Sequence, residues 1–186
     1  SRDDLVFLMS HDSDGFNRWE AGQRLAVDVI QEMVEQIEAG GTPSVDERLV
    51  SAFDVNLTQA LNGHRDPALD KAMIAHMLVL PAESYLIQLP ELANIDAIHQ
   101  ARNIVRNVIA KKLGGLLLSV YKLNQKKGPY EANAGQIAER SLKNVALAYL
   151  MQPDDTEMVQ LCVDQFTTAN NMTDTSAALR SLVGSA

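Results

Sequence analysis

AIHQARNIVRNVIAKKLGGLLLSVYKLN, residues 97–124, decides the fold class of this chain. Its apolar residues recur at intervals of three and four, which is the period of one helical face. They are Ile98, Ala101, Val105, Val108, Leu113, Leu116, Leu117 and Val120. We expect one long helix with Asp96 as its N-cap. Gly114 and Gly115 lie inside it, and we interpret this pair as a kink or a close helix crossing.

The same helical spacing continues on both sides of this stretch. It predicts further helices over residues 3–10, 15–39, 44–61, 67–80, 83–88, 134–151, 156–169 and 174–183. No segment shows sustained two-residue alternation, so we expect essentially no sheet.

Short connections favour antiparallel packing of the eight or nine predicted helices. The predicted fold class is all-α, with antiparallel helix pairs stacked as an irregular armadillo- or HEAT-like superhelix. An irregular bundle is the alternative. Residues 1–186 are interpreted as a single helical domain, in keeping with their length and their 46% hydrophobic content.

Polar residues at the predicted helix starts supply cap chemistry. Residues 44–47, SVDE, match a capping box, and Asp66 with Pro67 matches an N-cap followed by proline at the first helical position. Residues 12–17 lack the glycine at the sixth position that a calcium loop needs, so helix capping is favoured there. Asp154 and Asp155 are likewise assigned to a helix N-terminus.

Phe16 and Trp19 fall on the predicted inward stripe of the helix over residues 15–39, together with Ala26, Ile30, Met33 and Ile37. Aromatic residues at helical spacing more often belong to a core. A ligand pocket lined by Phe16 and Trp19 is the less favoured alternative.

The net charge of −8 argues against nucleic acid as a partner, because a negative surface repels phosphate. The lysines at positions 111, 112, 122, 126 and 127 are interpreted as a solvated helix end. Cys162 is the only cysteine, and its apolar neighbours predict a buried thiol. No apolar run reaches the length of a membrane span, and the first residues do not resemble a signal sequence. We expect no membrane partner and a cytoplasmic location.

The residues contain no recognisable catalytic arrangement. The four histidines, His11, His64, His76 and His99, include no pair at the spacing of a helical zinc site. Each is interpreted as a surface or capping residue. Phosphate-binding, dinucleotide-binding and nucleophile-elbow motifs are missing as well. We therefore assign no catalytic, cofactor-binding or metal-binding residue to this chain.

Several segments, taken in order along the chain, resemble the bacterial aminopeptidase N type of zinc aminopeptidase. They are FLMSH (7–11) followed by FNRWEA (16–21), VLP (79–81), DAI (96–98), RSLKN (140–144) with YL (149–150), and ANNMTD (169–174).

The resemblance implies a parent that is a multidomain zinc metallopeptidase removing N-terminal residues from peptides. This chain would be a truncated, non-catalytic C-terminal domain that encloses the active-site chamber and gates the access of peptides. Zinc would be bound by a domain that is not present, since this sequence contains no H-E-x-x-H and no G-x-M-E-N segment. The implied partners are the catalytic domain of the same parent chain and the peptide substrates. Asn170, Asn171, Thr173 and Asp174 would form an interdomain contact, with simple helix capping as the alternative.

The sequence is also compatible with two other functions. One is a stand-alone helical-repeat module that binds protein partners in a concave groove, although aromatic residues are only 5% of the chain. The other is a helical ligand-binding domain of a regulator, for which a basic helix-turn-helix would be expected and is not found.

Overall fold

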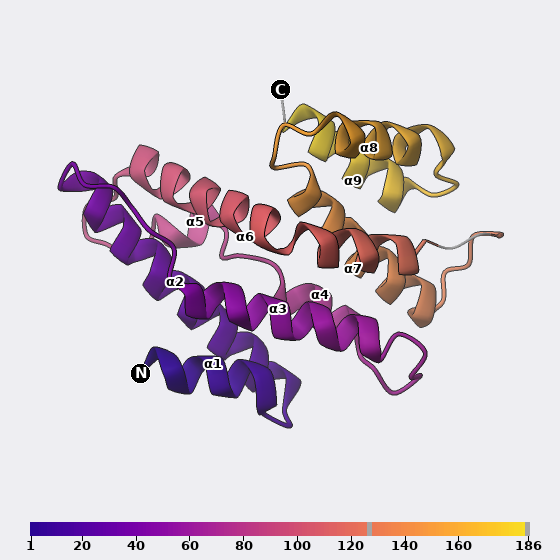
Figure 1. The fold of residues 1–186 in the computed structure, drawn as a ribbon, viewed down its shortest axis with the longest axis horizontal. Coiled ribbons are helices and arrows are strands. Elements are labelled where there is room, and N and C mark those ends of the chain that lie inside the picture. The colour runs from indigo at the N-terminus through magenta and orange to yellow at the C-terminus, as the bar shows by residue number, and fades with distance from the viewer. Residues whose placement is uncertain (126–127, 185–186) are drawn as a thin grey trace. The chain divides into compact units, whose positions relative to one another are not determined.

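The computed structural model describes residues 1–125 and 128–184. These residues form nine α-helices and no strand, so the prediction of an all-α fold is confirmed (Figure 1). The helices are α1 (Arg2–His11), α2 (Gly15–Glu38), α3 (Glu47–Asn62), α4 (Lys71–Met77), α5 (Glu83–Leu86), α6 (Ile95–Leu123), α7 (Ala134–Leu150), α8 (Thr156–Thr168) and α9 (Met172–Val183).

The chain divides into two compact units, each with its own internal contacts. The first comprises Ser1–Asn56 with His76–Ile109, and the second comprises Leu57–Ala75 with Ala110–Ala186. The interpretation of residues 1–186 as a single domain stays a prediction.

In the first unit α1 packs on α2 (Figure 1). Met9 is fully buried, and a Cβ added at Gly22 would lie 3.0 Å from the Met9 sulfur, so the small residue on α2 makes room for this side chain. The buried face of α2 consists of Ala21, Gly22, Leu25, Ala26, Val29, Ile30 and Met33. The prediction that Phe16 points inward is wrong, because its side chain is 61% exposed. The α1 contact covers α2 near Gly22 and leaves the first turn, with Phe16, open.

In the second unit α9 packs against both α7 and α8. Leu142, Ala146, Leu147 and Leu150 form the apolar stripe of α7 and are all buried. Cys162 of α8 is buried as predicted, and its Sγ lies 3.4 Å from the carbonyl oxygen of Ala178 in α9. Burial raises the pKa of this thiol from 9.0 to about 11.

The predicted starts of two helices are wrong, although a nearby aspartate caps each helix instead. Helix α3 begins at Glu47, with the backbone N–H of Arg48 donating to Asp46 Oδ1 at 2.9 Å, so the proposed box at residues 44–47 does not start it. Helix α4 begins at Lys71 rather than Pro67, and Asp70 accepts from the backbone of Met73 at 2.8 Å. Asp66 instead accepts from the backbone of Ala68 within a turn.

The start and the middle of α6 also differ from the prediction. Asn94, not Asp96, accepts a hydrogen bond from the backbone of Ala97, at 3.1 Å. The helix runs through Gly114 and Gly115, and a Cβ added at either glycine would meet no atom within 4 Å. The close crossing proposed for this pair is therefore wrong.

The lysine cluster near the end of α6 is exposed where the structure describes it. Lys111, Lys112 and Lys122 are exposed, which confirms that these three are solvated. Only Lys122 lies in the last turn of α6, so the assignment of Lys111 and Lys112 to a helix end is wrong. Lys126 and Lys127 lie outside the described residues.

Candidate functional site

The second unit contains a pocket of about 420 Å³ beside Asp174, which we call the Asp174 pocket. Its walls come from α6, α7, α8, α9 and the turns next to them, and they are predominantly polar. The lining residues are Tyr121, Gln125, Gly128, Lys143, Leu161, Asp164, Gln165, Thr168, Ala169, Asn170 and Asp174.

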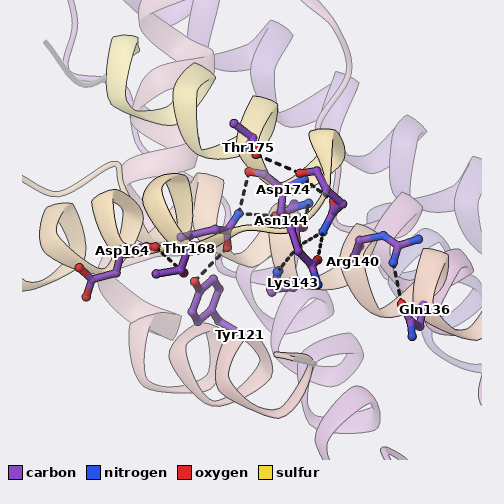
Figure 2. Close-up of polar contacts among 12 residues, drawn as sticks. Tyr121, Gln136, Arg140, Lys143, Asn144, Asp164, Thr168, Asp174 and Thr175 are labelled. Atoms are coloured by element: carbon purple, nitrogen blue, oxygen red, sulfur yellow. Dashed lines mark hydrogen bonds and ion pairs between the residues drawn. The ribbon is translucent and has the colours of Figure 1, made fainter. Parts of the chain in front are cut away.

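A buried ion pair forms one wall of the Asp174 pocket (Figure 2). Lys143 Nζ of α7 donates to Asp174 Oδ2 of α9 at 2.6 Å, and the two side chains are only 9% and 8% exposed. Asn144 Nδ2 donates to Asp174 Oδ1 at 2.9 Å, and Asn171 Nδ2 donates to Oδ2 at 3.0 Å. Both carboxylate oxygens therefore have partners inside the protein.

These contacts decide the protonation state of Asp174. Burial by itself raises the pKa of this carboxyl, but the hydrogen bonds from Lys143, Asn171 and Asn144 outweigh burial and hold the pKa below its ordinary value of 3.8. The carboxylate is thus ionised at neutral pH and fully engaged. A general base needs a free acceptor within reach of a substrate proton, so this geometry is that of a structural anchor.

Tyr121 and Gln165 extend the same network to α6 and α8 (Figure 2). The Tyr121 hydroxyl donates to Gln165 Oε1 at 2.9 Å. Gln165 Nε2 donates to Asn144 Oδ1 at 2.8 Å and to the backbone oxygen of Asp174 at 3.1 Å. Burial raises the pKa of Tyr121, so the phenol stays protonated and keeps its role as donor. Four helices are joined by hydrogen bonds that each have a defined donor and acceptor.

The four residues predicted to contact another domain separate into two groups. Asn171 is the N-cap of α9 and accepts from the backbone of Asp174 at 2.9 Å, while Asp174 itself is 5% exposed, so the capping alternative is confirmed for Asn171. Asn170 and Thr173 are exposed, and Asn170 Nδ2 donates to the carbonyl oxygen of Gly128 at 3.1 Å. An interdomain contact through these residues stays a prediction.

A second hollow, of about 670 Å³, lies at the start of α2 in the first unit. Phe16, Trp19 and Tyr85 line it, and the Phe16 and Trp19 rings lie 5.7 Å apart at 41°. The other lining residues are Glu20, Gln23, Arg24, Val27, Asp28, Pro81 and Ala82. The favoured assignment of the Phe16 and Trp19 pair to the core is therefore wrong for Phe16, and both residues line a surface hollow. That this hollow binds a ligand stays a prediction.

The remaining candidate residues have structural roles. Asp14 accepts from the backbone N–H groups of Phe16 and Asn17 at 2.7 and 3.2 Å, so the capping interpretation of this turn is confirmed. Asp155 caps α8 in the same way. Across residues 1–125 and 128–184, no three His, Cys, Asp or Glu side chains are grouped so that they could hold a metal ion. No helix in this part of the chain has both the length and the apolar character to cross a membrane.

The all-helical fold of the described residues is that of a helical-repeat domain. Residues 2–186 match the family described as "Domain of unknown function (DUF3458_C) ARM repeats", and the chain belongs to this family. Because this family is described as ARM repeats, the predicted armadillo-like superhelix is confirmed and the alternative of an irregular bundle is not.

Individual relatives that this chain matches are aminopeptidases. The chain is 32% identical over 180 residues to aminopeptidase N of Escherichia coli (strain K12), covering 96% of this chain and 20% of that protein. It is 34% identical over 182 residues to aminopeptidase N of Caulobacter vibrioides, covering 97% of this chain and 20% of that protein. The chain thus spans about a fifth of the length of these relatives, and the matched part is their C-terminal region.

A solved structure agrees on the fold. The crystal structure of Legionella pneumophila aminopeptidase A in complex with aspartic acid matches with a TM-score of 0.79 and 24% identity. The match covers 98% of this chain and 21% of the Legionella chain.

Sequence reasoning missed Lys143 as the partner of Asp174, although a signal was available. Lys143 shares one helical face with Ala146, Leu147 and Leu150, all of them buried. A lysine on a buried face requires a counterion, and Asp174 at the start of a neighbouring helix supplies it.

Proposed function

We propose that this chain is the non-catalytic helical part of a zinc aminopeptidase that removes N-terminal residues from peptides in the cytoplasm. In this proposal the chain encloses the active-site chamber and limits by size which peptides reach it. Zinc and the catalytic residues belong to another domain of the parent, and that domain and the peptide substrates are the partners.

One observation carries the proposal. The similarity to aminopeptidase N extends over 96% and 97% of this chain in two relatives, so it includes all nine described helices rather than one shared motif. A helical-repeat array also presents extended surface suited to forming a wall. Two parts of the surface are candidates for packing against other domains. One is polar and contains the exposed residues Asn170 and Thr173. The other is the hollow with Phe16, Trp19 and Tyr85, since contiguous exposed apolar groups commonly mark interaction sites.

The gating role is testable in the parent enzyme with substrates of different size. The intact parent is expected to cleave short peptides and to leave a folded protein with the same N-terminal residues untouched. Replacing Asn170 and Thr173 with arginine places bulk and charge into the proposed interdomain contact. We expect this variant to lose size discrimination while it still cleaves a single-residue anilide.

Asp154→Arg is the matched control, because Asp154 is exposed and lies in the turn before α8. Equal size discrimination in the control and in the Asn170 and Thr173 variant would count against the gating role. A chain that binds protein partners and occurs in the cell without a peptidase domain would instead favour the alternative, a stand-alone helical-repeat interaction module. The exposed aromatic residues at the start of α2 are the observation that keeps this alternative in view.

A further inference from the structure

The first unit has another hollow, of about 280 Å³, lined by the C-terminal half of α2, by α5, by the segment that joins α5 to α6 and by the start of α6. We call it the acidic hollow. Its volume is near the lower limit of pockets that hold small ligands, about 300 Å³. Its lining includes Ile30, Val34, Glu35, Glu38, Leu86 and Leu92.

The floor of the acidic hollow is apolar. Ile30 and Val34 are one helical turn apart on α2, and buried Leu86 of α5 lies across from them. Leu92 lines the same hollow while 91% exposed, and Ile95, three residues further on, is 59% exposed. An apolar side chain placed here would be covered on several sides and would remove Leu92 from water.

The rim of the acidic hollow is negative and lacks a counterion. Glu35 and Glu38 are three residues apart, so they share one face of α2. Within residues 1–125 and 128–184 neither carboxylate has an ion pair or a hydrogen bond, whereas Glu32 on the same helix pairs with Arg2 at 2.6 Å. Among the residues that the structure describes, no lysine or arginine lines the hollow.

The position of these carboxylates on the helix makes their lack of partners informative. Helix α2 ends at Glu38, and its last turn contains no basic residue. The exposed carbonyl groups at a helix C-terminus already carry partial negative charge, which basic side chains normally relieve. Glu35 and Glu38 add to that negative potential. A cationic group placed at this rim would therefore be attracted to it.

We propose that the acidic hollow binds a peptide that inserts one apolar side chain between Val34, Leu86 and Leu92 and places lysine or arginine on either side, facing Glu35 and Glu38. The substrate interpretation of this binding rests on the proposed function, which brings peptides to this domain. The hollow would favour cationic, leucine-containing peptides, which bind both its apolar floor and its acidic rim.

Binding of dye-labelled peptides to the 186-residue chain, measured by fluorescence anisotropy, tests the proposal. The probes carry a Lys-Leu-Lys, a Lys-Ser-Lys or a Glu-Leu-Glu core. We expect the Lys-Leu-Lys probe to bind most tightly and its affinity to fall as salt is raised. The combined Glu35→Gln and Glu38→Gln variant should bind it about five-fold more weakly. Leu92→Ser should weaken the affinity for the Lys-Leu-Lys probe about ten-fold.

The matched control replaces Asp154 with asparagine and Glu157 with glutamine, which removes two exposed carboxylates from the second unit. Its affinity should equal that of the unmodified chain. The proposal would be overturned if the hollow variants bound the Lys-Leu-Lys probe as tightly as the unmodified chain does. It would also be overturned if the unmodified chain bound the Glu-Leu-Glu probe as tightly as the Lys-Leu-Lys probe. Self-association of the chain that Leu92→Ser abolishes would also overturn it, because a second copy would then be the occupant.

The same two glutamine substitutions in the parent separate this inference from the proposed function. We expect a higher KM for Lys-Leu-Lys peptides and unchanged turnover of a single-residue anilide. A parent with peptidase activity whose hollow variants leave peptide binding and KM unchanged would end the inference and leave the proposed function standing. Peptide binding by the chain together with an inactive parent would end the proposed function alone.

Discussion

Replacing Asp174 with asparagine removes one charge from a buried pair and leaves the Lys143 ammonium without its counterion. The two side chains are 8% and 9% exposed, and the Nζ–Oδ2 distance is 2.6 Å. Breaking such a pair from one side costs about 3–5 kcal/mol, because a charge then stays buried and uncompensated. Asparagine has nearly the same shape as aspartate, so the loss of the charge is isolated from a change in packing.

That loss is large relative to the total stability of a typical domain, about 5–15 kcal/mol. Urea unfolding followed by far-UV circular dichroism measures this loss of unfolding free energy. We expect a lower urea concentration at the midpoint of unfolding and an unchanged dependence of the free energy on urea concentration. Adding Lys143→Met to Asp174→Asn removes the orphaned charge, and we expect the double variant to recover to within about 1–2 kcal/mol of the unmodified chain.

An exposed ion pair provides the comparison. Glu20 and Arg24 are 3.9 Å apart, with side chains 47% and 70% exposed. Glu20→Gln should cost less than about 1 kcal/mol, because water screens the pair. The reasoning is refuted if Asp174→Asn costs no more than Glu20→Gln, or if adding Lys143→Met recovers nothing.

Four further expectations follow from the same structure. Because the folded-state pKa of Asp174 lies below its ordinary 3.8, its charge stabilises the fold above that pH, and the stability difference between the unmodified chain and Asp174→Asn should shrink in urea titrations as pH falls below 3.8. Asn171→Ala removes the cap of α9 and should cost about 1 kcal/mol in thermal unfolding; an unchanged midpoint would contradict the capping role. Cys162, buried and with a pKa of about 11, should react with an aromatic disulfide reagent only as urea unfolds the chain, and rapid reaction of the folded chain would contradict its burial. Gly114→Ala and Gly115→Ala should each stabilise α6 by about 0.5–1 kcal/mol in urea unfolding, since an added Cβ meets nothing; destabilisation would mean that the space is occupied.

The helices themselves could be predicted from the sequence, because apolar spacing records which face of each helix is buried. The stripe of α7, with Leu142, Ala146 and Leu150, is an example in which every member is buried. The cap residues could not be chosen reliably. Asp96 and Asn94 both have cap chemistry, and the path of the chain before the helix decides that Asn94 is used.

The candidate sites depended on long-range contacts and were therefore predicted only in part. Asn171 and Asp174 were singled out as a polar cluster, but their link to Lys143 spans about thirty positions and is set by how α7 packs against α9. Periodicity placed Phe16 in the core, because it shows which residues share a face and not how far a neighbouring helix covers that face. Glu35 and Glu38 are exposed on α2, and only the long-range approach of the loop carrying Leu92 makes them part of the wall of a hollow.

The native size of the protein tests the central claim most directly. An antibody raised against this chain is used to blot a lysate of the source cells, and the band it detects is captured and assayed for zinc and for release of N-terminal residues from peptides. The account predicts a band several times larger than 20.4 kDa that carries both zinc and aminopeptidase activity. A single band near 20.4 kDa without peptidase activity would contradict it.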